Sequence, residues 1–541
     1  MDAGFAAAET LRAHGVDTLF TLSGGHLFPL YDGCVKTDVR LVDTRHEQTA
    51  AFAAEGWAKV TRRVGVAALT AGPGVTNGIS AITSAYLNGS PVCVIGGRAP
   101  HARWGVGSLQ ELDHIPIVAS VTKRASTLET PDAVAPGLDA ALRAARTPHR
   151  GPTFVDVPLD GWGPTDTGAP ETADSTAFAG DSPDPGAIGA VARLVGGAHQ
   201  PVLMIGGDVY WAGAEAEVRA FAEAARIPVF ANDMGRGVVP ADHELAFARA
   251  RATAFKGTDL VLVAGTPLDF RLGFGSFDAP VVHLVDSDAV LARHVELASS
   301  TVGDLRGTFA ALVEVLGAGD DTTARGDRDG WVDTLRADES SRRDTERARL
   351  TSDASPIDPA RVYGELRQRL ARDAIVIGDG GDFVSYAGKY VDTYTPGCFL
   401  GPGPYGCLGS GTGYALAAAL AHPERQVVVC YGDGAIGFTL GDLDTLVRHD
   451  VNVTAVIGNN GIWGLEKHPM QMIFGYDVVA ELRPGTRYDR VAEALGGHGE
   501  LVSEPGDIGP ALDRAFAHDG LSIVNVLTDP ADAYPRSSNL G

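Results

Sequence analysis

Two short polar strings near the carboxyl end of the chain constrain its fold more than any other feature. Gly432-Asp433-Gly434 ends an apolar run at 427–431, and Asn459-Asn460 follows a second apolar run at 451–457. Between the strings, Leu443, Leu446 and Val447 recur at helical spacing. The segment therefore predicts a βαβ unit, in which a helix connects two parallel strands.

The two strings offer oxygen ligands at one edge of the predicted sheet. Because loops at the carboxyl ends of parallel strands meet at the same edge, we expect Asp433 and Asn460 to lie side by side. A carboxylate and an amide oxygen suit a hard divalent cation that also holds a diphosphate. Taken singly, Gly-Asp-Gly is also typical of a turn and Asn-Asn of a helix cap, so the prediction depends on the pair.

Length and charge limit the classes of protein to which the chain can belong. Its 541 residues are enough for about three domains, and 45% hydrophobic residues favour a soluble α/β protein. A net charge of −24 argues against nucleic-acid and anionic-membrane partners. The cysteines lack metal-ligand spacing, and we recognise neither a membrane span nor a signal peptide, so we expect a cytoplasmic protein.

Three blocks of alternating strand and helix patterns are separated by two polar stretches. The blocks cover residues 1–163, 187–317 and 356–541, and their apolar runs predict buried parallel strands. The sequence thus predicts an α/β fold with three doubly wound parallel-sheet domains. We expect linkers at 163–186 and at about 317–356, with a surface helix in part of the second. The expected strands include 18–22, 39–44, 64–70, 92–95, 201–207, 260–265 and 374–377.

The spacing of the two polar strings resembles a known cofactor motif. Twenty-four residues separate Gly434 from Asn459, which resembles the metal–diphosphate motif of the thiamine-diphosphate (ThDP) enzymes. The order of the blocks is similar to the acetolactate-synthase-like superfamily, with pyrimidine-binding, central nucleotide-binding-like and diphosphate-binding domains. The resemblance covers essentially the whole chain and implies ThDP and Mg²⁺ as cofactors. It also implies an active site between two subunits, so we expect a homodimer or homotetramer.

In the first domain, the resemblance gives functional roles to four residues. Glu47 stands where the family has the glutamate that activates the aminopyrimidine of ThDP, although a lone glutamate opening a helix usually only complements the helix dipole. Gly72 begins a glycine loop that permits close approach of the cofactor. His26 and Gln110 fall on segments that face the substrate, and His26 departs from acetolactate synthases, which have a small residue there.

In the third domain, the resemblance implies cofactor contacts and metal ligands. Leu408 corresponds to the wedge that folds ThDP into a V shape, although a glycine-rich turn with one core leucine is an alternative reading. Asp382 stands where an amide is common in the family. The metal ligands would be the side chains of Asp433 and Asn460 and the main-chain oxygen of Ile462. The implied cofactor contacts are Gly381, Asp382, Gly406, Leu408, Gly434 and Ala435.

The middle block favours one branch of the family. Residues 232–240 and 265–275 resemble the 2-hydroxyacyl-CoA lyase and oxalyl-CoA decarboxylase branch. This implies a lyase that cleaves the C1–C2 bond of a 2-hydroxyacyl-CoA to give an aldehyde or ketone plus formyl-CoA. Glu466 is then the first candidate for the base that removes the 2-hydroxyl proton, and His26 the second. Alternatively, Glu466 is a surface charge paired with Lys467 or Lys123.

Two other functions stay open at this point. One is a synthase or decarboxylase of the acetolactate-synthase kind that acts on a free 2-oxo acid, and the other is a non-catalytic paralogue. The central domain would bind CoA, ADP or FAD, and the carboxyl-terminal tail is a candidate lid over a CoA entrance. Candidate nucleotide partners, each also readable as a surface charge, are Arg249, Arg251, Arg271, Asp286 and Asp288.

Overall fold

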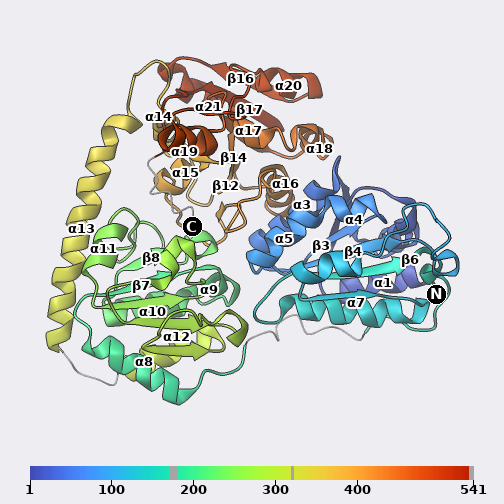
Figure 1. Ribbon diagram of the computed structural model, residues 1–541, viewed down its shortest axis with the longest axis horizontal. Helices are drawn as coiled ribbons and strands as arrows, with labels where there is room; N and C mark the ends of the chain where they lie inside the picture. The colour runs from blue at the N-terminus through green and yellow to red at the C-terminus, as the bar shows by residue number, and fades with distance from the viewer. Residues whose placement is uncertain (171–179, 318–321, 535–541) are drawn as a thin grey trace.

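The computed structural model describes residues 1–170, 180–317 and 322–534. Three parallel sheets, each with helices on its faces, form three domains (Figure 1). The first domain, in blue, lies beside the third, in orange and red, while the central domain, in green, lies below the third. The predicted α/β class with three parallel-sheet domains is confirmed.

The first domain is a six-stranded sheet with the order β2-β1-β3-β4-β6-β5. Its inner strands read as continuous apolar runs, because helices cover both faces of the sheet. The strands are β1 (Thr18–Thr21), β2 (Arg40–Asp43), β3 (Gly65–Leu69), β4 (Val92–Arg98), β5 (Arg124–Thr127) and β6 (Thr153–Pro158). The helices are α1 (Ala3–Ala13), α2 (Phe28–Lys36), α3 (Glu47–Thr61), α4 (Pro73–Asn77), α5 (Ile79–Leu87), α6 (Ile115–Val118) and α7 (Pro131–Arg146).

The central domain is a five-stranded sheet with the order β11-β10-β9-β7-β8. The strand order reverses between β7 and β9, which is where open α/β sheets bind their ligands. The strands are β7 (Pro201–Ile205), β8 (Val229–Ala231), β9 (Leu260–Ala264), β10 (Val281–Val285) and β11 (Ser299–Val302). The helices are α8 (Pro185–Gly197), α9 (Gly207–Trp211), α10 (Glu215–Ala225), α11 (Arg251–Gly257) and α12 (Leu305–Gly317).

The third domain is a six-stranded sheet with the order β13-β12-β14-β15-β17-β16. It contains the predicted βαβ unit, with β14 and β15 as neighbouring parallel strands. The strands are β12 (Ile375–Asp379), β13 (Phe399–Leu400), β14 (Val427–Gly432), β15 (Val453–Asn459), β16 (His498–Val502) and β17 (Leu521–Leu527). The helices are α14 (Pro359–Leu366), α15 (Asp382–Tyr390), α16 (Gly411–Ala421), α17 (Asp433–Ile436), α18 (Leu443–Arg448), α19 (Gly464–Phe474), α20 (Tyr488–Leu495) and α21 (Ile508–Ala517).

Helices α3 and α16 join the first domain to the third. A Cβ atom added at Gly413 of α16 would lie 2.7 Å from the Cβ of Phe52 in α3. Likewise, a Cβ at Gly56 would lie 2.8 Å from the Cα of Tyr414. Glycine at these two positions lets the helix backbones approach closely, which fixes the first domain against the third.

A long helix occupies most of the second polar stretch, where we expected chiefly a linker. Helix α13 (Thr322–Leu350) runs along the edge of the molecule from the central to the third domain (Figure 1). Ion pairs one turn apart, such as Arg342–Asp338 and Arg343–Glu339, stabilise a helix that is polar on most of its surface. The other expected linker, 163–186, lies partly outside the described residues.

Helix α13 is bonded to both domains that it connects. Near its beginning, Arg328 donates hydrogen bonds to the carbonyl oxygens of Ala198 and Ala225 in the central domain. Near its end, Arg349 forms an ion pair with Asp358 of the third domain at 2.6 Å. The predicted linker is therefore a packed structural element.

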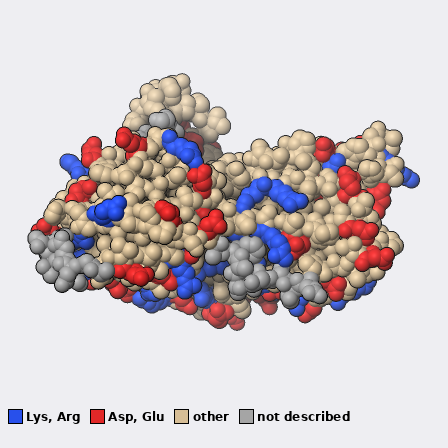
Figure 2. Space-filling model, turned by 90° about the horizontal axis from the view of Figure 1, so that it is seen from below, with Lys and Arg blue, Asp and Glu red and all other residues tan. Residues whose placement is uncertain are grey.

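Charged side chains of both signs are interspersed over the face of the molecule shown in Figure 2. Within the described residues, we find no helix that is both long and apolar enough to cross a membrane.

Candidate active site

The two polar strings of the βαβ unit lie together at the carboxyl edge of the third sheet. Asp433 begins α17 directly after β14, and its Oδ2 accepts a hydrogen bond from the Gly461 N–H at 2.9 Å. Asn460 follows β15, and its Oδ1 accepts the Ile462 N–H at 3.2 Å. Burial raises the pKa of Asp433 to about 6, and a bound cation would favour the charged form. The carboxylate of the buried Asp433 and the amide oxygen of the partly buried Asn460 are ligands that fit a divalent cation.

Close contacts at glycines shape the space around this edge. A Cβ atom added at Gly434 would lie 2.3 Å from the ring of Trp463, and one at Gly381 would lie 2.9 Å from Leu465. At Gly380, a Cβ atom would lie 3.5 Å from the Cβ of Ala435. Asp382 begins α15 and lies against Gly464, the first residue of α19. The starts of two helices therefore meet beside Asp433, an arrangement that suits a diphosphate group.

A fully buried aspartate holds the loop that carries Gly406 and Leu408. Asp379, the last residue of β12, accepts hydrogen bonds from the N–H groups of Gly409 at 3.1 Å and Gly411 at 2.7 Å. Gly406 has a φ of +65°, which glycine adopts without strain. The Leu408 carbonyl accepts a weak hydrogen bond from Gln48 of α3 at 3.4 Å. This role of Asp379 was not predicted, although an aspartate ending a buried strand is a recognisable signal.

Glu47 is the first residue of α3 and is 7% exposed. Its Oε2 accepts a hydrogen bond at 3.0 Å from Nδ2 of Asn77, the last residue of α4. Asn77 was not predicted as a site residue, because its contact with Glu47 spans thirty residues of the chain.

Three further predicted residues gather around the loop at 70–77. His26 is buried, and its Nδ1 lies 3.3 Å from the Thr70 hydroxyl oxygen. Burial, with a smaller effect from His114, lowers the pKa of His26, so the ring is neutral near pH 7. A Cβ atom added at Gly72 would lie 3.0 Å from the main-chain oxygen of Gln110. The structure thus brings His26, Gly72 and Gln110 together.

Glu466 lies exposed in the first turn of α19. The two lysines considered as its partners bind elsewhere: Lys467 forms an ion pair with Glu481, and Lys123 donates a hydrogen bond to the Thr147 carbonyl at 2.6 Å. A role of Glu466 as a base therefore stays a prediction.

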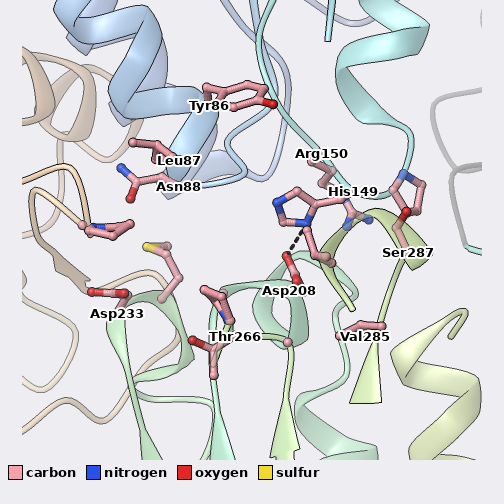
Figure 3. A pocket seen from close by; sticks show the side chains of 18 of the residues that line it. Tyr86, Leu87, Asn88, His149, Arg150, Asp208, Asp233, Thr266, Val285 and Ser287 are labelled. Carbon is pink, nitrogen blue, oxygen red and sulfur yellow. Dashed lines mark ion pairs between the residues drawn. The ribbon is translucent and has the colours of Figure 1, made fainter. Parts of the chain in front are cut away.

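The central domain borders a cavity of about 390 Å³ (Figure 3). His149 lines it, with its ring nitrogen 3.3 Å from Asp208 and 3.4 Å from Asp286. Burial disfavours the protonated ring, but these two carboxylates outweigh that effect and raise the pKa of His149 to about 10. Gly207 and Gly265 follow β7 and β9, so the cavity lies at the point where the strand order reverses.

The five predicted nucleotide partners do not all lie at this cavity. Arg271 lines it and forms ion pairs with Asp269 and Asp233. Arg249 and Arg251 line a second cavity of about 380 Å³, and Asp288 pairs with Arg293 at the surface at 2.6 Å. Arg271 is therefore the one of the five candidates that lines the first cavity, while Asp286 lies against His149 of its lining.

Comparison with known families identifies the three domains. Residues 1–117 match the model "Thiamine pyrophosphate enzyme, N-terminal TPP binding domain", and residues 188–312 match the central domain of the same enzymes. Residues 379–526 match their "C-terminal TPP binding domain". The chain belongs to the thiamine pyrophosphate enzymes. Thiamine pyrophosphate is another name for ThDP, so the cofactor is ThDP with a divalent metal, typically Mg²⁺.

Relatives of two kinds are similar over most or all of the chain. "Acetolactate synthase large subunit IlvG" of Mycobacterium tuberculosis and "Probable acetolactate synthase" of Mycobacterium bovis are each 54% identical over 100% of this chain and 98% of their own length. "2-hydroxyacyl-CoA lyase 2" of Caenorhabditis elegans is 32% identical over 98% of this chain and 90% of its own length. The lyase of the same name from Bos taurus is 34% identical over 92% of this chain and 85% of its own length.

Proposed function

We propose that this ThDP-dependent enzyme is a synthase of the acetolactate-synthase kind, acting on free 2-oxo acids. Such a synthase releases CO₂ from one 2-oxo acid and joins the remaining acyl group to the carbonyl carbon of a second. The observation that carries the proposal is the 54% identity over the whole chain to two proteins named acetolactate synthases. The 2-hydroxyacyl-CoA lyases, which the sequence analysis favoured, are 30% to 34% identical.

The residues present provide a consistent set for the cofactor. Asp433, Asn460 and the Ile462 carbonyl would hold the metal, and the starts of α15 and α19 would receive the diphosphate. When bound, ThDP supplies a carbanion that adds to a carbonyl carbon. The Glu47 carboxylate would exchange a proton with the pyrimidine ring. The burial of Glu47 would keep water out of this exchange.

A second candidate, cleavage of a 2-hydroxyacyl-CoA, is supported by His26. Its buried, neutral ring can accept a proton close to Gly72 and Gln110. Such a cleavage must remove the proton of the substrate's 2-hydroxyl group. His26 would act as the base for this step, together with Glu466 or in its place. In either function, Gln110 would orient the substrate.

We also propose that the cavity beside His149 holds a nucleotide. Arg271 would bind a phosphate group there, and Asp286 would bind a ribose hydroxyl only if its contact with His149 opened. Whether the nucleotide belongs to ADP, CoA or FAD is decided by extracting the purified protein and identifying what it releases by mass.

A second copy of the chain is proposed to complete the active site. Apolar side chains are exposed on the loop that carries Gln110, where Val106 and Leu109 are 76% and 80% exposed. They are also exposed after Glu466 on α19, where Met472 and Phe474 are 74% and 62% exposed. Burial of both groups in a homo-oligomer would remove apolar surface from water.

One assay separates the two functions. The protein is incubated with ThDP and Mg²⁺ and offered pyruvate in one arm and a series of 2-hydroxyacyl-CoAs in the other, with products identified by mass. Acetolactate and CO₂ from pyruvate alone support the synthase, whereas formyl-CoA with no acetolactate overturns it. The Glu47→Gln variant and a chelator-treated sample serve as controls, in which the formation of either product should be strongly reduced.

A further inference from the structure

A fully buried histidine–aspartate pair lies behind the loop at 70–77. His114 and Asp156 are both 0% exposed, and Nδ1 of His114 lies 2.9 Å from Oδ2 of Asp156. On its other side, Nε2 of His114 lies 3.0 Å from the main-chain nitrogen of Gly72. A carboxylate only accepts hydrogen bonds, so Nδ1 carries the proton and Nε2 is free to accept the Gly72 N–H.

The aspartate is itself held in place. Arg98 donates a hydrogen bond to the same Asp156 oxygen at 3.0 Å. The ring of Phe154 packs edge-on against the imidazole, with ring centroids 6.1 Å apart. The imidazole is thus fixed on both its polar and its apolar sides.

The Gly72 N–H that His114 accepts belongs to the residue that starts α4. Gly72 has a φ of +60° and is the N-cap of this five-residue helix. The helix ends at Asn77, whose side chain donates a hydrogen bond to Glu47. Because α4 is little more than one turn, fixing its start also fixes its end. Hydrogen bonds and this short helix therefore connect Asp156 to the Glu47 carboxylate.

We propose that His114 is a positioning residue, which together with Asp156 anchors α4 and so orients the carboxylate of Glu47 for proton exchange. The inference rests on the proposed role of Glu47 in activating the cofactor. It assigns a function to a buried polar pair that touches neither the metal ligands nor the nucleotide cavity.

The test compares two substitutions at His114 with a matched control. His114→Leu removes both ring hydrogen bonds, whereas His114→Gln retains an oxygen for Gly72 and an amide for Asp156. His283 of β10 is the control, because it is also fully buried, accepts the Ala292 N–H at 3.2 Å, and donates to the Thr266 carbonyl at 3.1 Å. His283→Leu thus also removes one accepted main-chain N–H bond and one donated bond, although the donated bond goes to a carbonyl rather than a carboxylate, at a site far from Glu47 in the sequence.

Three experiments are made on each variant. Amide hydrogen exchange of residues 70–78 is followed by mass spectrometry in cofactor-free protein, ThDP affinity by fluorescence titration, and kcat and KM by product formation. For His114→Leu we expect about tenfold faster exchange in this segment and about a tenfold lower kcat, with KM within about threefold of the wild-type value. In His114→Gln, kcat and the exchange rate should lie within about threefold of the wild-type values. His283→Leu should change neither quantity by more than about threefold.

Two results would overturn the proposal: unchanged exchange at 70–78 in His114→Leu, or an equal loss of kcat in His283→Leu. If His114→Leu does not fold, Asp156→Asn is used, because it keeps the volume but no longer fixes the proton on Nδ1. We then expect amide exchange at 70–78 to be at least about threefold faster than in wild type. Unchanged exchange in this variant would contradict the proposal. Failure of the proposed function can be told apart from failure of this inference. If the wild-type protein bound no ThDP, the proposed function would fail, but the exchange measurement would still be valid because it uses cofactor-free protein.

Discussion

Two glutamates on the same helix, α3, differ in how completely their carboxylates are bonded. Glu55 is 0% exposed and has four polar partners: Lys59 at 3.0 Å, Tyr414 and Asn88 at 2.8 Å, and Ser90 at 3.1 Å. Glu47, eight residues earlier, accepts one hydrogen bond among the described residues, from Asn77. A saturated carboxylate stabilises the fold, whereas an incompletely bonded one keeps an oxygen available for chemistry.

The carboxyl-terminal half of α3, which carries Glu55 and its partner Lys59, contacts the other two domains. Lys59 donates a hydrogen bond to the Tyr414 hydroxyl of the third domain at 3.0 Å. The Lys59 carbonyl accepts one from Tyr210 of the central domain at 2.6 Å. This end of α3 therefore joins all three domains, while its beginning presents Glu47 to the proposed cofactor site.

The largest expected effect is that of Glu47→Gln on catalysis. Loss of the proton-exchanging carboxylate should lower kcat by about 100-fold to 10,000-fold, the usual contribution of acid–base catalysis. The free energy of unfolding should change by less than about 1 kcal/mol, because one hydrogen bond is at stake. Product formation and urea unfolding measure the two quantities, and a strongly destabilised Glu47→Gln would remove the contrast with Glu55.

Glu55→Gln should show the opposite pattern. Removing this charge leaves the Lys59 ammonium buried without its ion-pair partner, at a cost of about 3–5 kcal/mol in the free energy of unfolding. Protein that remains folded should keep its kcat within a few-fold of wild type. Combining Glu55→Gln with Lys59→Met should recover part of the lost stability, and a kcat loss as large as that of Glu47→Gln would show that Glu55 also takes part in catalysis.

Asn77→Ala tests the single partner of Glu47. One hydrogen bond to a charged group contributes about 1.5–3 kcal/mol, so kcat should fall by about 10-fold to 150-fold if the bond orients the carboxylate. Stability should change little, since Asn77 is exposed in this chain. Wild-type kcat in this variant would mean that the contact does not position Glu47.

The smallest effect is expected for Gln48→Ala, at the next position of the helix. Its hydrogen bond to the Leu408 carbonyl is long, at 3.4 Å, and should contribute no more than about 0.5 kcal/mol. ThDP affinity measured by titration should therefore stay within about twofold of wild type. A larger loss would place this side chain among the groups that shape the cofactor site.

Local patterns predicted most of the fold. The apolar runs placed β3, β9, β12 and β14 within one or two residues, because strands buried on both faces are continuous apolar segments. The adjacency of Asp433 and Asn460 followed from one βαβ unit. Helix α13 was only partly foreseen, since its stability depends on spaced ion pairs and on contacts with two domains rather than on an apolar stripe.

Contacts between distant segments could not be predicted in the same way. Asn77 meets Glu47 through the packing of α4 against α3, and His114 meets Asp156 of β6 across 42 residues. Neither pair has a signature in local spacing. The acyl-CoA lyase interpretation rested on resemblance in the central domain, and whole-chain identity now favours the synthase alternative. Glu466 lies in the first turn of α19, and its partners depend on side-chain packing that local spacing does not reveal.

Helix α13 also limits how the chain can vary in length. Each residue of an α-helix turns the chain by about 100°, so deleting one residue between Arg328 and Arg349 would rotate every later side chain away from its present partner. The central and third domains would then be held at a wrong mutual angle, as well as about 1.5 Å closer together. A scan of single-residue deletions should find this helix as intolerant as a buried strand, despite its polar composition.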